Sequence, residues 1–122
     1  MANRDPLKHF LKKEDLEPPI RRTIIDANTG LPYDLTGASA VFYMKTVGGS
    51  VKINGAAAII ESPASSGIIR YDWTTGDTDT SGEYYAEFVI ALASGKEITF
   101  PAGEFEPGKS YINVLITNRA SN

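Results

Sequence analysis

The sequence predicts an all-β domain built as a sandwich of two antiparallel sheets. Turn-forming pairs recur about every ten residues, and the segments between them alternate apolar and polar residues with a period of two. A chain of 122 residues suits one domain that can bury a real core. Because each sheet has one apolar face to hide, packing two sheets face to face is the economical arrangement.

The turn signals divide the chain into about seven to nine short strands. They are Asn28-Thr29-Gly30, Thr36-Gly37, Gly48-Gly49, Asn54-Gly55, Ser66-Gly67, Thr75-Gly76, Ser94-Gly95 and Pro107-Gly108. Ser94-Gly95 lies between two alternating runs, so it is predicted to form a tight hairpin.

The alternation predicts which side chains form the core. The inward positions are Ala40, Phe42, Met44, Ile69, Tyr71, Trp73, Tyr84, Ala86, Phe88, Ile90, Leu92, Ile98, Phe100, Ile112, Val114 and Ile116. A fully buried aromatic side chain at such a position stabilises by about 1.5–3 kcal/mol. Tyr43, Tyr85 and Tyr111 are predicted to face outward, where they either pair across strands or act as contact residues, since tyrosine covers a large area at low entropy cost.

The chain divides into three parts. Residues 1–19 are predicted to be an N-terminal arm or an edge strand, residues 20–118 the β-sandwich domain, and residues 119–122 a tail. Only residues 7–16 have a pattern that a helix could use, and Pro18-Pro19 would end it. The arm therefore either forms the first edge strand or packs on a neighbouring subunit.

The arm holds the other candidate contact residues and the sole histidine. Phe10 and Leu11 are candidate contact residues, because apolar side chains outside a core need a docking surface. We expect His9 to be exposed and not catalytic, since no G-x-S-x-G elbow accompanies it. Neither common phosphate-binding loop pattern occurs. The sequence thus predicts no enzyme activity, no catalytic residue and no cofactor.

Composition excludes several other classes. The chain has no cysteine, which removes disulfides and thiolate metal sites. Residues 1–25 carry six basic and four acidic side chains, but the net charge is −3 and the pI about 5.1, which disfavours nucleic-acid binding. No run of 18 apolar residues and no signal-peptide block occurs, so neither a membrane partner nor export is indicated.

The stretch YDWTTGDTDTSGEYYAEF (71–88) is acidic and rich in glycine and threonine. Asp77 and Asp79 have the spacing of two calcium ligands, but Glu83 comes too early to close a standard calcium loop. A structural turn is the favoured interpretation, ahead of a calcium site or a catalytic loop, so no metal is predicted. Asp79, Gly82 and Tyr84 resemble the corner of immunoglobulin-like domains, where a tyrosine hydroxyl bonds to the backbone upstream.

Several stretches carry a family resemblance. They are LTGASAVFYMK (35–45), VKINGAAAII (51–60), GIIRYDWTTGDTDTSGEYYAEFVI (67–90) and ASGKEITFP (93–101). The most specific parts are Tyr71-Asp72-Trp73, Gly76-Asp77-Thr78-Asp79-Thr80 and Gly82-Glu83-Tyr84, with Thr99-Phe100-Pro101 in support. Together they resemble the N-terminal domain of phage baseplate upper proteins and its stand-alone relatives in phage and prophage genomes, over roughly residues 7–116.

The resemblance implies an immunoglobulin-like β-sandwich that serves as a docking module and has no enzymatic activity. Baseplate upper proteins continue into helical and receptor-carrying parts, whereas this sequence ends at Asn122. We therefore expect a stand-alone adaptor subunit of the tail, baseplate, neck or capsid surface, made in the host cytoplasm and located in the virion. Its expected partners are other phage structural proteins and copies of itself.

The sequence allows two functions other than docking. A carbohydrate-binding or host-adhesion module would use an outward ring such as Tyr43 or Tyr85 to stack on a sugar. A wall-degrading enzyme would need a cleft between opposed carboxyl groups, for which the sequence offers no motif.

Overall fold

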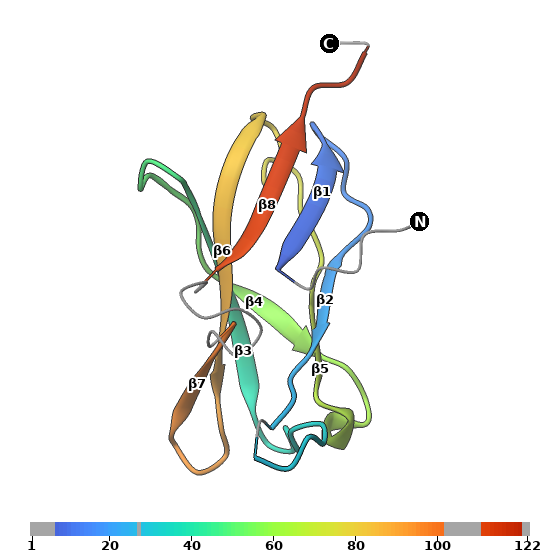
Figure 1. The fold of residues 1–122 in the computed structure, drawn as a ribbon, viewed down its shortest axis with the longest axis vertical. Helices are drawn as coiled ribbons and strands as arrows, with labels where there is room; N and C mark the ends of the chain where they lie inside the picture. The colour runs from blue at the N-terminus through green and yellow to red at the C-terminus, as the bar shows by residue number, and fades with distance from the viewer. Residues whose placement is uncertain (1–6, 27, 102–110, 121–122) are drawn as a thin grey trace.

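Strands account for nearly all of the regular structure, which confirms the predicted all-β class. The computed structural model describes residues 7–26, 28–101 and 111–120. Within these ranges Figure 1 shows long strands and a single short 3-10 turn, η1. The elements are β1 (Lys8–Lys12), β2 (Ile20–Thr23), β3 (Ser39–Thr46), β4 (Val51–Ile60), η1 (Ala64–Ser66), β5 (Ile68–Tyr71), β6 (Gly82–Ala91), β7 (Glu97–Phe100) and β8 (Ile112–Thr117).

The strands form two layers that share β4. The larger layer has the order β1-β8-β6-β3-β4, and β7 pairs with the second half of β6. Ile59 and Ile60, at the end of β4, pair with β5, and β5 pairs with β2 to complete the smaller layer. Figure 1 shows β4 crossing from the β3 side of the molecule to the β5 side. The result is a folded-over sheet, between a sandwich and a barrel.

One strand pair among the described residues is not antiparallel. β1 runs parallel to β8, with Phe10 opposite Leu115. The purely antiparallel sheets predicted from the sequence are therefore corrected to a mixed arrangement. Parallel partners need a long connection between them, and nearly the whole chain lies between these two strands.

The core is formed by the side chains that the period of two predicted. Phe42 on β3 is fully buried and stacks on Tyr71 of β5, with ring centroids 4.4 Å apart, so it joins the two layers. The ring of Phe88 lies 5.0 Å from that of Phe42. Of the predicted inward positions, only Leu92 and Ile98, near the β6–β7 hairpin, are partly rather than fully buried.

β4 contains a bulge where the sequence predicted a turn at Asn54-Gly55, so that prediction is wrong. Phe42 pairs with Ala56 and Tyr43 pairs with Asn54, which leaves Gly55 as an extra residue in the strand. Its φ of +76° is a conformation that glycine adopts without steric cost. The chain already reverses just after β3, so the run that follows continues as a single strand.

The expectation that His9 is exposed is wrong. Leu7, just before β1, and His9 and Leu11 within it face inward, and His9 is only 8% exposed. Its Nε2 lies 3.2 Å from the carbonyl oxygen of Pro18, which also accepts a hydrogen bond from Trp73 Nε1 at 3.0 Å. The imidazole therefore helps to hold the segment after β1 against the body of the domain.

Lowering the pH from about 7.5 to about 5.5 is expected to reduce the free energy of unfolding through His9. Burial, together with the positive charge of Arg22, lowers the pKa of His9 from its ordinary value of 6.5. The unfolded chain then takes up a proton first as the pH falls, so a contribution that is complete above about pH 6.5 is progressively lost below it. Urea denaturation at the two pH values measures the loss. The decrease in the free energy of unfolding between the two pH values should be smaller in His9→Gln than in the parent. An equal decrease in both proteins would show that other groups cause it.

Candidate contact surface

One face of the larger layer carries four of the five predicted contact residues. Phe10 on β1 is 52% exposed, and Tyr43 on β3 is 36% exposed. Tyr85 on β6 and Tyr111, which directly precedes β8, are half-buried on the same face. Leu11 instead faces the core and is 5% exposed, so its side chain is not available to a partner.

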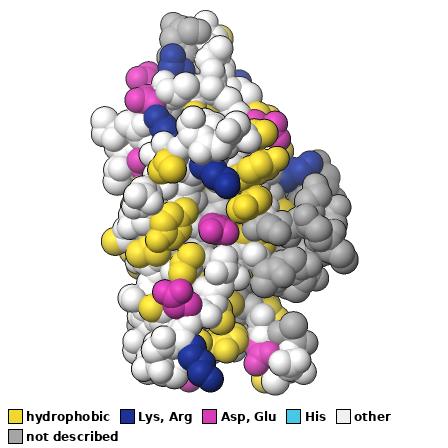
Figure 2. Space-filling model, turned by 90° about the vertical axis from the view of Figure 1, so that its left-hand side faces the viewer, with side chains coloured by type: hydrophobic (Ala, Val, Ile, Leu, Met, Phe, Trp, Pro, Cys, Tyr) yellow, Lys and Arg dark blue, Asp and Glu magenta, His cyan; other side chains and the backbone are white. Residues whose placement is uncertain are grey.

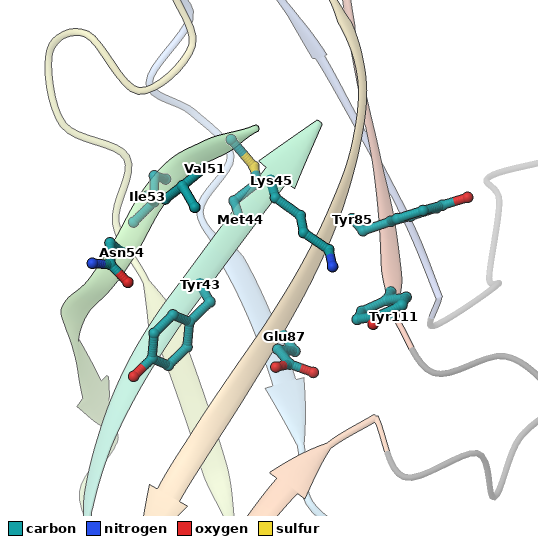
Figure 3. A pocket seen from close by; sticks show the side chains of 9 residues that line it. All are labelled: Tyr43, Met44, Lys45, Val51, Ile53, Asn54, Tyr85, Glu87 and Tyr111. Carbon is teal, nitrogen blue, oxygen red and sulfur yellow. The ribbon is translucent and has the colours of Figure 1, made fainter. Parts of the chain in front are cut away.

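The three tyrosines line one open hollow of about 170 Å³, here called the tyrosine hollow. Its lining residues are Tyr43, Met44, Lys45, Val51, Ile53, Asn54, Tyr85, Glu87 and Tyr111. In Figure 3 the side chains of Lys45 and Glu87 lie between Tyr43 on one side and Tyr85 and Tyr111 on the other. Figure 2, seen from the side of the β3–β4 hairpin, shows hydrophobic patches separated by single basic and acidic groups.

The ring of Tyr43 lies against the bulge of β4. A Cβ atom placed on Gly55 would be 3.3 Å from Oη and 3.4 Å from Cζ of Tyr43. The absence of a side chain at Gly55 therefore lets the ring approach the backbone closely. Among the described residues no second aromatic ring stacks on Tyr43, and its exposure leaves ring surface open to solvent.

The opposite wall of the tyrosine hollow is a pair of stacked rings. The centroids of Tyr85 and Tyr111 are 5.1 Å apart, and the ring planes differ by 15°. The ammonium of Lys45 lies 5.2 Å from the centroid of Tyr111, within the range of a cation–π contact. In the pairing of β3 with β6, Lys45 is opposite Tyr85 and Glu87 is opposite Tyr43. Antiparallel pairing thus assembles the hollow.

Sequence reasoning did not single out the polar members of the tyrosine hollow. Asn54 and Glu87 are far apart in the chain and meet only because both are register partners of Tyr43, on its two sides. Strand register is the one signal that could have found them. The bulge at Gly55 sets the register that puts Asn54 opposite Tyr43, whereas the Asn54-Gly55 pair predicts a turn there.

The acidic loop between β5 and β6 is organised by hydrogen bonds to its own chain. Oδ2 of Asp77 accepts hydrogen bonds from the Tyr71 hydroxyl at 2.6 Å and from the Thr74 amide at 2.8 Å. Asp79 accepts one from Lys52, which lowers the pKa of that carboxyl. In the part of the chain that the structure describes, no three metal-ligating side chains come together. Both aspartates therefore act as acceptors within the fold.

Tyr84 makes the hydrogen bond that the corner interpretation requires. Its hydroxyl donates to the carbonyl oxygen of Thr80 at 2.6 Å, and its side chain is 2% exposed. Thr80 in turn donates its hydroxyl to Asp79. Gly82 begins β6 between these residues and Tyr84. The three predicted corner residues therefore lie together where the loop enters the strand.

Replacing Tyr84 with phenylalanine is expected to lower the free energy of unfolding by about 1 kcal/mol, because it removes one hydrogen bond and keeps the buried ring. Tyr43→Phe is the matched control, since the Tyr43 hydroxyl bonds to no described residue; its effect should be close to zero. Urea denaturation measures both variants. Equal losses in the two would show that the hydroxyl of Tyr84 adds nothing to the corner.

Among the described residues, no helix has the length and apolar character needed to span a bilayer. The fold and the site together define a class of protein: a small all-β domain with an exposed face that combines aromatic and charged side chains.

The sequence also identifies the family. A family model described as the BppU N-terminal domain matches residues 22–121. This match covers most of the chain, so the protein belongs to that family, as the resemblance indicated. No curated protein matches the sequence. Membership indicates a structural protein of a phage baseplate and implies a location in the virion.

Proposed function

We propose that the protein is a non-enzymatic docking subunit of a phage particle. It contacts copies of itself and other structural proteins of the tail, baseplate, neck or capsid surface. Family membership over residues 22–121 is the observation that carries this proposal. The buried core that joins the two layers supports it, because a subunit that works by fit needs a folded surface of defined shape.

We further propose that the fold is an immunoglobulin-like sandwich. The hydrogen bond from Tyr84 to Thr80 supports this assignment, since a tyrosine corner is a feature of such domains. A connection through β4 between the two layers is compatible with it.

The surface best suited to docking is the β1 patch, which consists of Phe10, Leu115, Lys8 and Lys12. Phe10 is 52% exposed and lies opposite Leu115, while Lys8 and Lys12 are exposed on the same face of β1. An exposed aromatic side chain between two positive charges suits a neighbour that offers an apolar pocket with an acidic rim.

Purified particles test the proposal. The protein should co-purify with virions in a fixed number of copies per particle. Phe10→Asp should lose incorporation, because the charge would have to enter an apolar pocket. Leu31→Asp is the matched control: Leu31 is 64% exposed in a distant loop, and the variant should incorporate normally. A protein found in infected cells but absent from virions would end the proposal.

A further inference from the structure

We propose that the tyrosine hollow is a binding site for one neutral sugar ring. The inference goes beyond docking and concerns residues outside the β1 patch. It depends on three properties of the hollow: its charge, its aromatic walls and its size.

The charges in the hollow favour a neutral ligand with both donors and acceptors. Lys45 and Glu87 supply one positive and one negative group, and neither forms an ion pair with a described residue. The two opposite charges offset each other, so the hollow offers no net attraction to either a cation or an anion. Hydroxyl groups can donate to the carboxylate of Glu87 and accept from the ammonium of Lys45. The amide of Asn54 lines the same hollow and can do both.

The aromatic walls suit the apolar face of a pyranose. Tyr43 packs over the bulge at Gly55, where an added Cβ would lie 3.3 Å from its Oη, so the backbone of β4 supports the ring on one side. A ligand that stacks on this ring has little side-chain entropy to remove. The rings of Tyr85 and Tyr111 are already stacked on each other. Tyr43 is therefore the platform, and the other two form the far wall.

The size of the hollow limits the ligand. About 170 Å³ is smaller than the roughly 300–1,000 Å³ of pockets for drug-sized molecules. One ring fits such a space, and further sugars of a chain would extend into solvent. A single small ring making few contacts is expected to bind with a dissociation constant on the order of 1 mM.

NMR titration of the full chain tests the proposal. The probes are the methyl glycosides of glucose, galactose, rhamnose, N-acetylglucosamine and N-acetylgalactosamine, each raised to about 50 mM. N-acetyl-arginine amide and N-acetyl-glutamate amide serve as charged probes of similar size. The expected result is a saturable shift of backbone amides around the hollow with at least one glycoside and with neither charged probe. No shift with any glycoside, or larger shifts with a charged probe, would overturn the proposal.

Four variants separate the parts of the site. Tyr43→Ala should weaken binding at least tenfold, whereas Tyr43→Phe, which keeps the ring, should bind nearly as well as the parent. Glu87→Gln should weaken binding severalfold, because it removes the charge of the acceptor at constant shape. Leu31→Ala, on a distant loop, should change nothing. The spectra themselves show whether each variant folds. Binding that survives in a folded Tyr43→Ala would contradict the proposal.

The outcome is independent of the docking proposal. Tyr43→Ala should still enter particles, because Tyr43 lies outside the β1 patch. If Tyr43→Ala loses incorporation and the parent binds no glycoside, the hollow is a protein contact and the sugar proposal fails while docking stands. If the parent binds a glycoside but is absent from virions, docking fails and the sugar site stands.

Discussion

Replacing Phe42 with alanine is expected to lower the free energy of unfolding by about 3–5 kcal/mol. Phe42 is completely buried, and its ring contacts those of Tyr71, Trp73 and Phe88 at centroid distances of 4.4, 5.7 and 5.0 Å. These partners come from both layers, so no single side chain can move to fill the cavity. Such a loss is a large part of the roughly 5–15 kcal/mol that a domain has in total.

Phe10→Ala is the matched control for this variant. The substitution is the same, but Phe10 is 52% exposed, so its effect should stay within about 0.5 kcal/mol. Urea denaturation of the three proteins gives the comparison. A Phe42→Ala domain nearly as stable as the Phe10→Ala domain would show that the two layers are not joined through this ring.

Gly67→Ala is expected to cost about 2–4 kcal/mol, of which about 1 kcal/mol is backbone strain and the rest is crowding. Gly67 has a φ of +71°, and an added Cβ would lie 2.9 Å from the carbonyl oxygens of both Ile24 and Tyr33. These are backbone atoms, which cannot turn aside as a side chain does. The Gly67 carbonyl oxygen also accepts a hydrogen bond from the Ile24 amide at 2.7 Å. The clash would push these two backbone segments apart and weaken that hydrogen bond.

Gly30→Ala is the matched control, because it introduces the same backbone strain without the crowding. Gly30 has nearly the same φ, +73°, but nothing lies within 4 Å of an added Cβ. It should therefore cost only about 1 kcal/mol. The difference in thermal or urea stability between the two variants measures the close approach at Gly67. Equal effects would mean that the junction of Gly67 with Ile24 and Tyr33 is loose.

The inward faces of the strands could be predicted from the sequence because the alternation is local. Ile112, Val114 and Ile116 are all buried, as a period of two requires. The parallel pairing of β1 with β8 could not be predicted in this way. It joins opposite ends of the chain, and no turn signal marks such a pair.

His9 shows how a short strand can mislead. Leu7, His9 and Leu11 alternate inward, but Phe10 places the bulkiest apolar side chain on the opposite face. The apolar pattern of the arm therefore allows two opposite predictions of which face of the strand is turned toward the core. The carbonyl of Pro18 and the ring of Trp73 decide between them, because they give the imidazole a partner inside the fold.

The sequence predicts the outward direction of each tyrosine of the candidate site, but not that the three lie together. Tyr43, Tyr85 and Tyr111 were predicted to face outward, and the structure places them around one hollow. Their meeting depends on the register of β6 with β3 and β8, which joins strands far apart in the chain. The extra residue at Gly55 sets only the position of Asn54 opposite Tyr43, and a bulge cannot be distinguished from a turn by composition alone.

A density map of the intact particle is the most direct test of the central claim, which is that this domain works in the virion by docking through the β1 patch. We expect ordered density for the domain at a fixed position, with Phe10 buried against a neighbouring protein and the tyrosine hollow open to solvent. A domain in ordered density whose Phe10 faces solvent would contradict docking through the β1 patch, as would a particle that lacks the domain.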